Sequence, residues 1–248
     1  MKSINNYISE KLVINKNTVK KYYKYFPETK KELQDIIEQR IKEEGNECDL
    51  NDIDVSKITD ISELFIDSSF NGNISEWDVS NVTNMSAMFY ASKFNQDISL
   101  WNVSNVTNMN SIFCCSKFNQ DISGWDVSNV KDMVNMFAFS EFNGDISNWD
   151  VSNVKDMFGM FEDSKFNQDI SNWNVSNVED MCYMFEKSEF NQDISNWNVS
   201  NVKEFNYMFS KSKFNQDISN WKLKSKVKIN NIFDNSPLDG KEKEWWNK

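Results

Sequence analysis

Tryptophan recurs at intervals of 24 residues, and no other feature constrains the fold of this 248-residue chain as strongly. Phenylalanine keeps the same interval in two further series, one from Phe65 to Phe233 and one from Phe70 to Phe214. A fixed interval of this length is typical of repeat proteins, in which each unit buries its apolar residues only against its neighbours. The pattern therefore predicts a stack of similar coils. The tryptophans of the series are Trp77, Trp101, Trp125, Trp149, Trp173, Trp197 and Trp221.

Each unit combines two kinds of periodicity, which predicts an α/β coil. Trp149 and Val151 alternate onto one side, as in a short parallel strand. Four apolar residues from Val154 to Phe161 then fall at i, i+3, i+6 and i+7, the spacing of a short helix. Asn153 and the serine before it have the residue types of a helix N-cap, and the acidic residue three positions later fits a capping box. The eight units begin at Leu50, Ile74, Ile98, Ile122, Ile146, Ile170, Ile194 and Ile218.

The pattern divides the chain into four parts. Residues 1–28 form a weakly patterned leader, and residues 29–49 form an N-terminal capping helix and turn. The eight-coil stack spans residues 50–241, and residues 242–248 form a C-terminal tail. An uncapped terminal coil would expose its core, so the helix is expected to cover the first coil.

The predicted capping helix has a clear start and two distinct sides. Thr29 and Glu32 have the spacing of a capping box. Leu33 and Ile37 mark the apolar side that should face the first coil. The polar side, which carries Arg40, the single arginine of the chain, is predicted to face solvent.

Composition excludes several classes of partner. The formal charge of −11 and the isoelectric point near 4.6 disfavour nucleic acid and anionic membranes, because both repel an acidic surface. The N-terminal region has no apolar core of a signal peptide, and no run of about 20 apolar residues occurs, so we expect no membrane insertion. We also expect a monomer.

The four cysteines do not form a framework that follows the repeat. Cys48, Cys182 and the adjacent pair Cys114 and Cys115 stand at different repeat positions, whereas disulfides of a repeat protein should recur with it. The adjacent pair has two interpretations: a redox-active or metal-binding site, or thiols that fill small or edge positions.

The string from Ile170 to Phe185, I-S-N-W-N-V-S-N-V-x-x-M-x-x-M-F, resembles the BspA-like leucine-rich repeat family. It is most similar to the version rich in Trp, Met and Phe that occurs in mycoplasma surface lipoproteins. The resemblance covers residues 50 to about 236. It implies a right-handed solenoid of the leucine-rich-repeat type and a role in surface adhesion or host interaction. It also implies a cell-surface location, whereas the sequence alone favours an intracellular one.

A column of aspartates, each two residues after an asparagine, is the one candidate metal site that the repeat itself predicts. Oxygen ligands on neighbouring coils suit calcium. Alternatively, Asn shapes a turn while Asp accepts hydrogen bonds from the loop backbone. The chain contains no histidine, which excludes histidine triads and histidine metal ligands. The aspartates are Asp97, Asp121, Asp145, Asp169, Asp193 and Asp217.

Aromatic residues also occur at positions that vary between units, beside the apolar stripe. Exposed aromatic residues among polar neighbours are common in protein interfaces, so these residues form a candidate partner patch. Packing between adjacent coils is the alternative. The regular tryptophans are interpreted as core, with a carbohydrate-stacking platform as the alternative. The candidate patch consists of Tyr90, Phe139, Phe158, Tyr183 and Tyr207.

The sequence therefore predicts a non-catalytic module that presents an extended acidic surface to another protein, without a cofactor. A structural or antigenic repeat protein without a specific ligand is one alternative. An enzyme is the other: Asp126 and Asp150, on neighbouring coils, could form the carboxylate pair of a glycoside hydrolase. Such an enzyme needs one carboxyl group with a raised pKa in a pocket.

Overall fold

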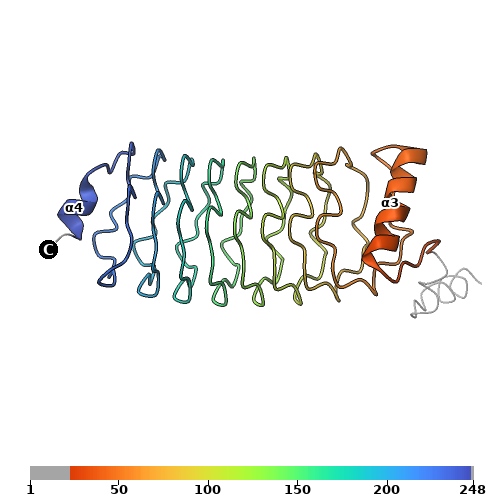
Figure 1. Cartoon of the computed structure of the whole chain (residues 1–248), viewed down its shortest axis with the longest axis horizontal. Coiled ribbons are helices and arrows are strands. Elements are labelled where there is room, and N and C mark those ends of the chain that lie inside the picture. The colour runs from red at the N-terminus through yellow and green to blue at the C-terminus, as the bar shows by residue number, and fades with distance from the viewer. Residues whose placement is uncertain (1–22, 247–248) are drawn as a thin grey trace, which may run out of the picture.

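The computed structural model describes residues 23–246, which form an elongated stack of coils (Figure 1). Helix α3 (Lys30–Glu44) lies at one end of the stack and helix α4 (Lys241–Trp245) at the other. Most of the predicted leader, residues 1–22, and the last two residues of the tail lie outside the described residues.

The predicted strand and helix within each coil are wrong. In the part of the chain that the structure describes, the two helices flank the repeats and no extended strand forms. Instead, neighbouring coils are joined by isolated parallel β-bridges. Each coil contributes a single bridge residue, which stands two positions after the second valine of V-S-N-V. The fold is therefore not the α/β solenoid that the sequence predicted. The bridge residues are Asp60, Asn84, Asn108, Asp132, Asp156, Asp180, Glu204 and Lys228.

Successive tight turns replace the predicted helix. In the second coil the amide of Met88 donates to the carbonyl of Met85, and that of Tyr90 to Ala87, both at 3.2 Å. The intervening amides point to the next coil, as that of Phe89 does to the carbonyl of Ile112 at 3.0 Å. Turns closed between residues three apart place i and i+3 on the same side, as a helix does. The spacing of the apolar residues could not distinguish the two.

The turns require two left-handed residues in every coil. Ala87 and Ala91 have φ values of 52° and 51°, and Tyr183 and Lys187 have 58° and 56° at the same two repeat positions. A left-handed conformation costs a non-glycine residue about 1–2 kcal/mol. The hydrogen bonds between coils hold this conformation whatever side chain is present, so these two positions are free to vary.

The predicted core is confirmed. All seven regular tryptophans are 3–4% exposed, which excludes them as a carbohydrate-stacking platform. The indole Nε1 of Trp149 donates to the carbonyl of Ile122 in the preceding coil at 3.1 Å. The phenylalanines stack along the molecule, with the ring centroids of Phe161 and Phe185 5.6 Å apart. One apolar core therefore runs through all the coils.

The polar residues predicted to cap helices connect coils instead. The side-chain amide of Asn153 donates to the carbonyl of Ser128 in the preceding coil at 2.7 Å. A second asparagine series does the same at the opposite turn, where Asn119 Oδ1 accepts from the amide of Asn143 at 2.9 Å. These asparagines satisfy backbone groups that would otherwise lack partners at each turn.

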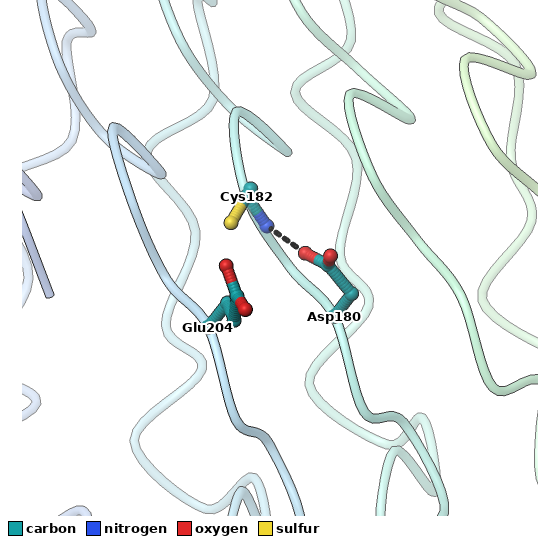
Figure 2. Close-up of side chains that lie close together, drawn as sticks. All are labelled: Asp180, Cys182 and Glu204. Atoms are coloured by element: carbon teal, nitrogen blue, oxygen red, sulfur yellow. Dashed lines mark hydrogen bonds between the residues drawn. The ribbon is translucent and has the colours of Figure 1, made fainter. Parts of the chain in front are cut away.

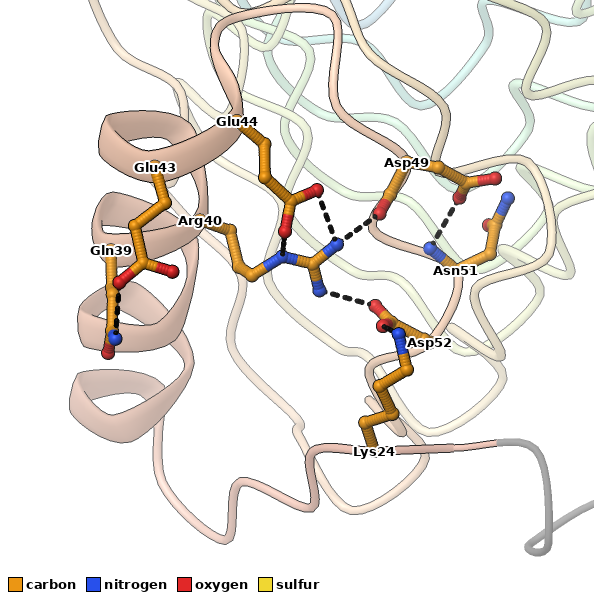
Figure 3. Close-up of polar contacts among 8 residues, drawn as sticks. All are labelled: Lys24, Gln39, Arg40, Glu43, Glu44, Asp49, Asn51 and Asp52. Atoms are coloured by element: carbon orange, nitrogen blue, oxygen red, sulfur yellow. Dashed lines mark hydrogen bonds and ion pairs between the residues drawn. The ribbon is translucent and has the colours of Figure 1, made fainter.

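Helix α3 covers the N-terminal end, and Arg40 joins it to the first coil (Figure 3). The Thr29 hydroxyl accepts from the Glu32 amide at 3.2 Å, as predicted. The prediction that Arg40 faces solvent is wrong, because this residue is 6% exposed. Its guanidinium donates to Glu44 Oε1 and to Asp52 Oδ1, both at 2.7 Å. A planar group with five donors can satisfy several acceptors at once, which makes a buried position tolerable.

Helix α4 and the residue after it cover the other end. The rings of Trp245 and Trp246 each lie 5.8 Å from that of Phe233, the last phenylalanine of its series. Lys222 and Lys224 are exposed on the last coil. Charged lysines at the end of a stack hinder the addition of another chain.

Candidate functional site

One surface of the stack carries several positions that change from coil to coil. We call it the ladder face: it covers the hydrogen-bonded turns from the bridge residue to the residue seven positions later, which are residues 156–163 in the fifth coil. Several positions on this face carry different residues in different coils. At one of them, successive coils carry Tyr90, Cys114, Ala138, Glu162, Glu186 and Ser210.

All five residues of the candidate patch lie on the ladder face, in two groups. Phe158, Tyr183 and Tyr207 come from three successive coils and form a continuous aromatic cluster. The ring centroids of Phe158 and Tyr183 are 5.2 Å apart, and those of Tyr183 and Tyr207 are 5.0 Å apart with nearly parallel planes. Tyr90 and Phe139 lie apart from this cluster, on the second and fourth coils.

The sequence left open whether these aromatic residues form an exposed patch or pack between adjacent coils, and the residues of the cluster do both. The rings of Phe158, Tyr183 and Tyr207 pack on one another across coils, yet each side chain is only half-buried. Stacking fixes the positions of the rings, and part of each side chain remains exposed to solvent.

Carboxylates flank the aromatic cluster on both sides. Asp156, Asp180 and Glu204 follow one another in the column of bridge residues, and Glu162 and Glu186 stand on the other side. Burial raises the pKa of Asp156, and the charge of Asp180 raises it further. Burial likewise raises the pKa of Glu162, with an added contribution from Glu186. The charges are therefore crowded together and partly removed from water.

Few cations neutralise these carboxylates. Lys228 Nζ lies 2.6 Å from Glu204 Oε1, and Lys187 Nζ lies 3.8 Å from Glu186 Oε1. Within residues 23–246, no ion pair reaches Asp156, Asp180 or Glu162.

Cys182 lies between two of the carboxylates (Figure 2). One ligand atom from each of Asp180, Cys182 and Glu204 lies within 4.8 Å of the others, a spacing that could hold a metal ion. Burial, with a further contribution from Asp180, raises the pKa of the Cys182 thiol to about 12. A metal would have to displace this proton and compete with Lys228 for Glu204. Sequence reasoning missed the group because the acids of this column were interpreted as helix caps.

Two overlapping stretches, residues 31–141 and 137–245, match the family described as "Mycoplasma protein of unknown function, DUF285". The chain belongs to this family. The match supports the resemblance to mycoplasma repeat proteins, but not the finer assignment to BspA-like leucine-rich repeats. No curated protein and no solved structure matches the chain.

None of the helices described in this DUF285 protein is both long enough and apolar enough to cross a membrane.

The aspartate column, for which calcium binding was the alternative to a role in turns, consists of turn residues in this DUF285 protein. Asp145 Oδ1 accepts from the amide of Ser147 at 2.9 Å, and Asp169 Oδ1 from that of Ser171 at 2.8 Å. These hydrogen bonds lower the pKa of both aspartates. Among the described residues, only the group of Asp180, Cys182 and Glu204 brings three acidic or cysteine ligand atoms within 4.8 Å of one another. The geometry favours the turn interpretation of the column.

Cys114 and Cys115 lie on the ladder face. Their sulfur atoms are 3.6 Å apart, and Cys114 is buried whereas Cys115 is exposed. Burial raises the pKa of Cys114, and the neighbouring Cys115 raises the pKa of Tyr90. The surroundings of Cys114 therefore disfavour the thiolate, which is the reactive form of a cysteine.

Asp126 and Asp150, the carboxylate pair of the alternative in which the protein is a glycoside hydrolase, lie outside the ladder face. Asp126 and Asp150 are exposed, and each accepts a hydrogen bond from the amide two residues later. Hydrogen bonds from Ser152 lower the pKa of Asp150. A general acid requires a shift in the other direction.

Proposed function

We propose that this protein is a non-catalytic interaction module whose ladder face binds another protein. The observation that carries the proposal is the cluster of Phe158, Tyr183 and Tyr207, in which three half-buried aromatic side chains touch across three successive coils. Tyrosine and other aromatic residues dominate the energetics of protein interfaces, because they bury a large area and lose little conformational freedom.

The arrangement of constant and variable positions supports a binding role for this face. The constant residues build the core, the turns and the contacts between coils. The left-handed positions of the ladder face, by contrast, accept Ala87, Asn135, Tyr183 and Asn231 on the same backbone. A rigid backbone with interchangeable side chains lowers the entropic cost of binding.

Surface adhesion is the specific form of this function that we favour, because the chain belongs to a mycoplasma family and its repeat sequence resembles that of surface lipoproteins. A catalytic role lacks comparable support. The described carboxylates with raised pKa values, Asp156 and Glu162, stand beside like charges on neighbouring coils, and burial together with this repulsion accounts for the shifts.

Capture experiments with the full chain test the proposal. Asparagine occupies the backbone position of Tyr183 and Tyr207 in two other coils, at Asn135 and Asn231, so Tyr183→Asn/Tyr207→Asn should leave the fold unchanged. Wild-type and variant protein are used as bait for extracts of the source cells and of host cells. Leu100→Asn is the control, because Leu100 is 88% exposed away from the ladder face.

A partner should be captured by the wild type and by Leu100→Asn. Its affinity for the tyrosine variant should fall roughly 30-fold or more, since one interface hot spot is worth about 2 kcal/mol. Equal capture by all three proteins, with equal thermal midpoints, would show that the ladder face is not the binding surface. It would favour a structural or antigenic repeat.

A further inference from the structure

We infer that the ladder face over the fifth to seventh coils takes a cationic segment of its partner. Lysine or arginine side chains would lie among the carboxylates of Asp156, Asp180 and Glu162, and their apolar stems against Tyr183 and Tyr207. This inference rests on the proposed function and specifies the chemistry of the partner.

Charge complementarity is the first argument. Five carboxylates flank the aromatic cluster, and two lysines, Lys187 and Lys228, pair with two of them. The formal charge of this group is therefore −3. Asp156 and Asp180 are adjacent bridge residues, so their like charges are held close together by the backbone. A cation from a partner would relieve this repulsion, whereas nucleic acid and an anionic membrane surface would increase it.

The aromatic cluster is the second argument, and it selects a side chain over a free ion. The rings of Tyr183 and Tyr207 cover each other's faces, because their planes differ by 12° at a centroid distance of 5.0 Å. Their exposed edges offer apolar surface and hydroxyl groups beside the acids. The stems of lysine and arginine cover apolar surface while the charged ends reach the carboxylates.

The repeat supplies matched variants that remove charge and keep the turn. Asp156 Oδ1 accepts from the amide of Phe158 at 2.9 Å, and Asn84 Oδ1 accepts from that of Ser86 at the same repeat position at 3.1 Å. Asp156→Asn/Asp180→Asn should therefore fold as the wild type does. The control Asp169→Asn/Asp193→Asn removes two charges from the same two coils, at a position where Asn73 makes the same turn.

The probe is a flexible, fluorescein-labelled peptide of lysine, arginine, glycine and serine. Its binding to the full chain is measured by fluorescence anisotropy at about 0.15 M salt, where distant charges are screened. A twin peptide carries glutamine at every cationic position. Wild-type protein should bind the cationic peptide and not the glutamine twin. Asp156→Asn/Asp180→Asn should bind it roughly tenfold more weakly, and Asp169→Asn/Asp193→Asn within about twofold of wild type.

Three results would overturn the inference. Equal weakening by both double variants would mean that the peptide responds to net charge alone. Equal binding of both peptides by wild-type protein would mean that cations are not selected, and this comparison needs no variant. In addition, a captured partner that requires Tyr183 and Tyr207 but binds Asp156→Asn/Asp180→Asn normally would refute the cationic segment while leaving the proposed function intact. Capture that is indifferent to the tyrosines would refute the proposed function instead.

Discussion

At the scale of single residues, the buried polar groups show how one side chain connects two coils. Trp149 fills the core of its own coil and donates its indole hydrogen to Ile122 of the preceding one. The same contact recurs along the series, as for Trp173 and the carbonyl of Ile146 at 3.1 Å. Each of these tryptophans therefore contributes both to the packing of the core and to a hydrogen bond between coils.

Substitution of Trp149 should separate these two contributions. Trp149→Ala should lower the free energy of unfolding by about 3–5 kcal/mol, because it opens a cavity in a core that cannot collapse freely. Trp149→Phe keeps much of the volume and leaves the Ile122 carbonyl without its donor, so it should cost about 1–3 kcal/mol. Urea unfolding measures both values. An equal loss of unfolding free energy in the two variants would contradict the separation of packing from hydrogen bonding at Trp149.

Arg40 is a buried charge whose partners are Glu44 in α3, the carbonyl of Asp49 in the turn that follows, and Asp52 in the first coil. Arg40→Lys keeps the charge but cannot reach Glu44, Asp52 and the carbonyl of Asp49 together. It should lower the free energy of unfolding by roughly 2–4 kcal/mol. Lys42→Arg, on an exposed part of the same helix, is the control and should change stability little. Wild-type stability of Arg40→Lys would mean that the ion pairs do not hold the helix in place.

At the scale of elements, the fold is built from turns whose amides alternate between their own coil and the next. Asp and Asn close these turns through their side chains at several positions in each coil, as Asp150, Asp156 and Asp169 do in the fifth coil. The surroundings of each carboxylate then decide whether its pKa is lowered or raised. The pKa of Asp145 is lowered by hydrogen bonds from Ser147, whereas that of Asp156 is raised by burial and by Asp180.

These opposite shifts predict opposite pH dependence. The raised pKa of Asp156 gives stability that is fully present below its unfolded pKa and lost as pH rises through the folded value. Asp156→Asn should therefore raise the free energy of unfolding near pH 7, on the order of 0.5 kcal/mol. The gain should vanish near pH 3, where the wild-type carboxyl is protonated.

Asp145→Asn is the matched control for that experiment. The lowered pKa of Asp145 contributes stability above its unfolded pKa that is lost as pH falls through the folded value. Its replacement should bring no gain near pH 7. Urea unfolding of both variants across this pH range checks the signs, and a gain for Asp145→Asn that equals the gain for Asp156→Asn would mean that net charge alone is responsible.

At the scale of the whole molecule, each coil contacts mainly its two neighbours, and the ends are covered by α3 and α4 (Figure 1). The stability of such a stack is approximately a sum over coils and their interfaces. The aromatic cluster occupies the fifth to seventh coils, so its geometry should not depend on the number of coils before it.

Deletion of the complete third coil, residues 98–121, tests this modularity. The flanking coils keep their repeat register, so the shortened chain should fold with a smaller denaturant slope and a lower free energy of unfolding. Binding of the cationic peptide should stay within about twofold of wild type. Deletion of residues 170–193, which removes Tyr183, should abolish that binding while the chain still folds. Loss of binding in both deletions would place the site elsewhere.

The sequence by itself determined the repeat, its register and its core. Trp149, Met157 and Phe161 are buried as predicted, because a constant apolar residue in every unit has no other place in a stack. It also indicated the five aromatic residues, all of which the structure places on one face. Turns closed between residues three apart and helices both place i and i+3 together, so the sequence could not decide between them.

Only the tertiary structure decided that contacts between coils outweigh local helix formation, because every second amide of the turns is satisfied by a neighbouring coil. It also decided that Phe158, Tyr183 and Tyr207 touch while Tyr90 and Phe139 stand apart, and that the acids of the bridge column flank the cluster rather than cap helices. The repeat register shows which residues hold the same position in neighbouring coils, as Tyr183 and Tyr207 do. The distance between different repeat positions, such as those of Phe158 and Tyr183, depends on the path of the chain within each coil, and only the structure gives it.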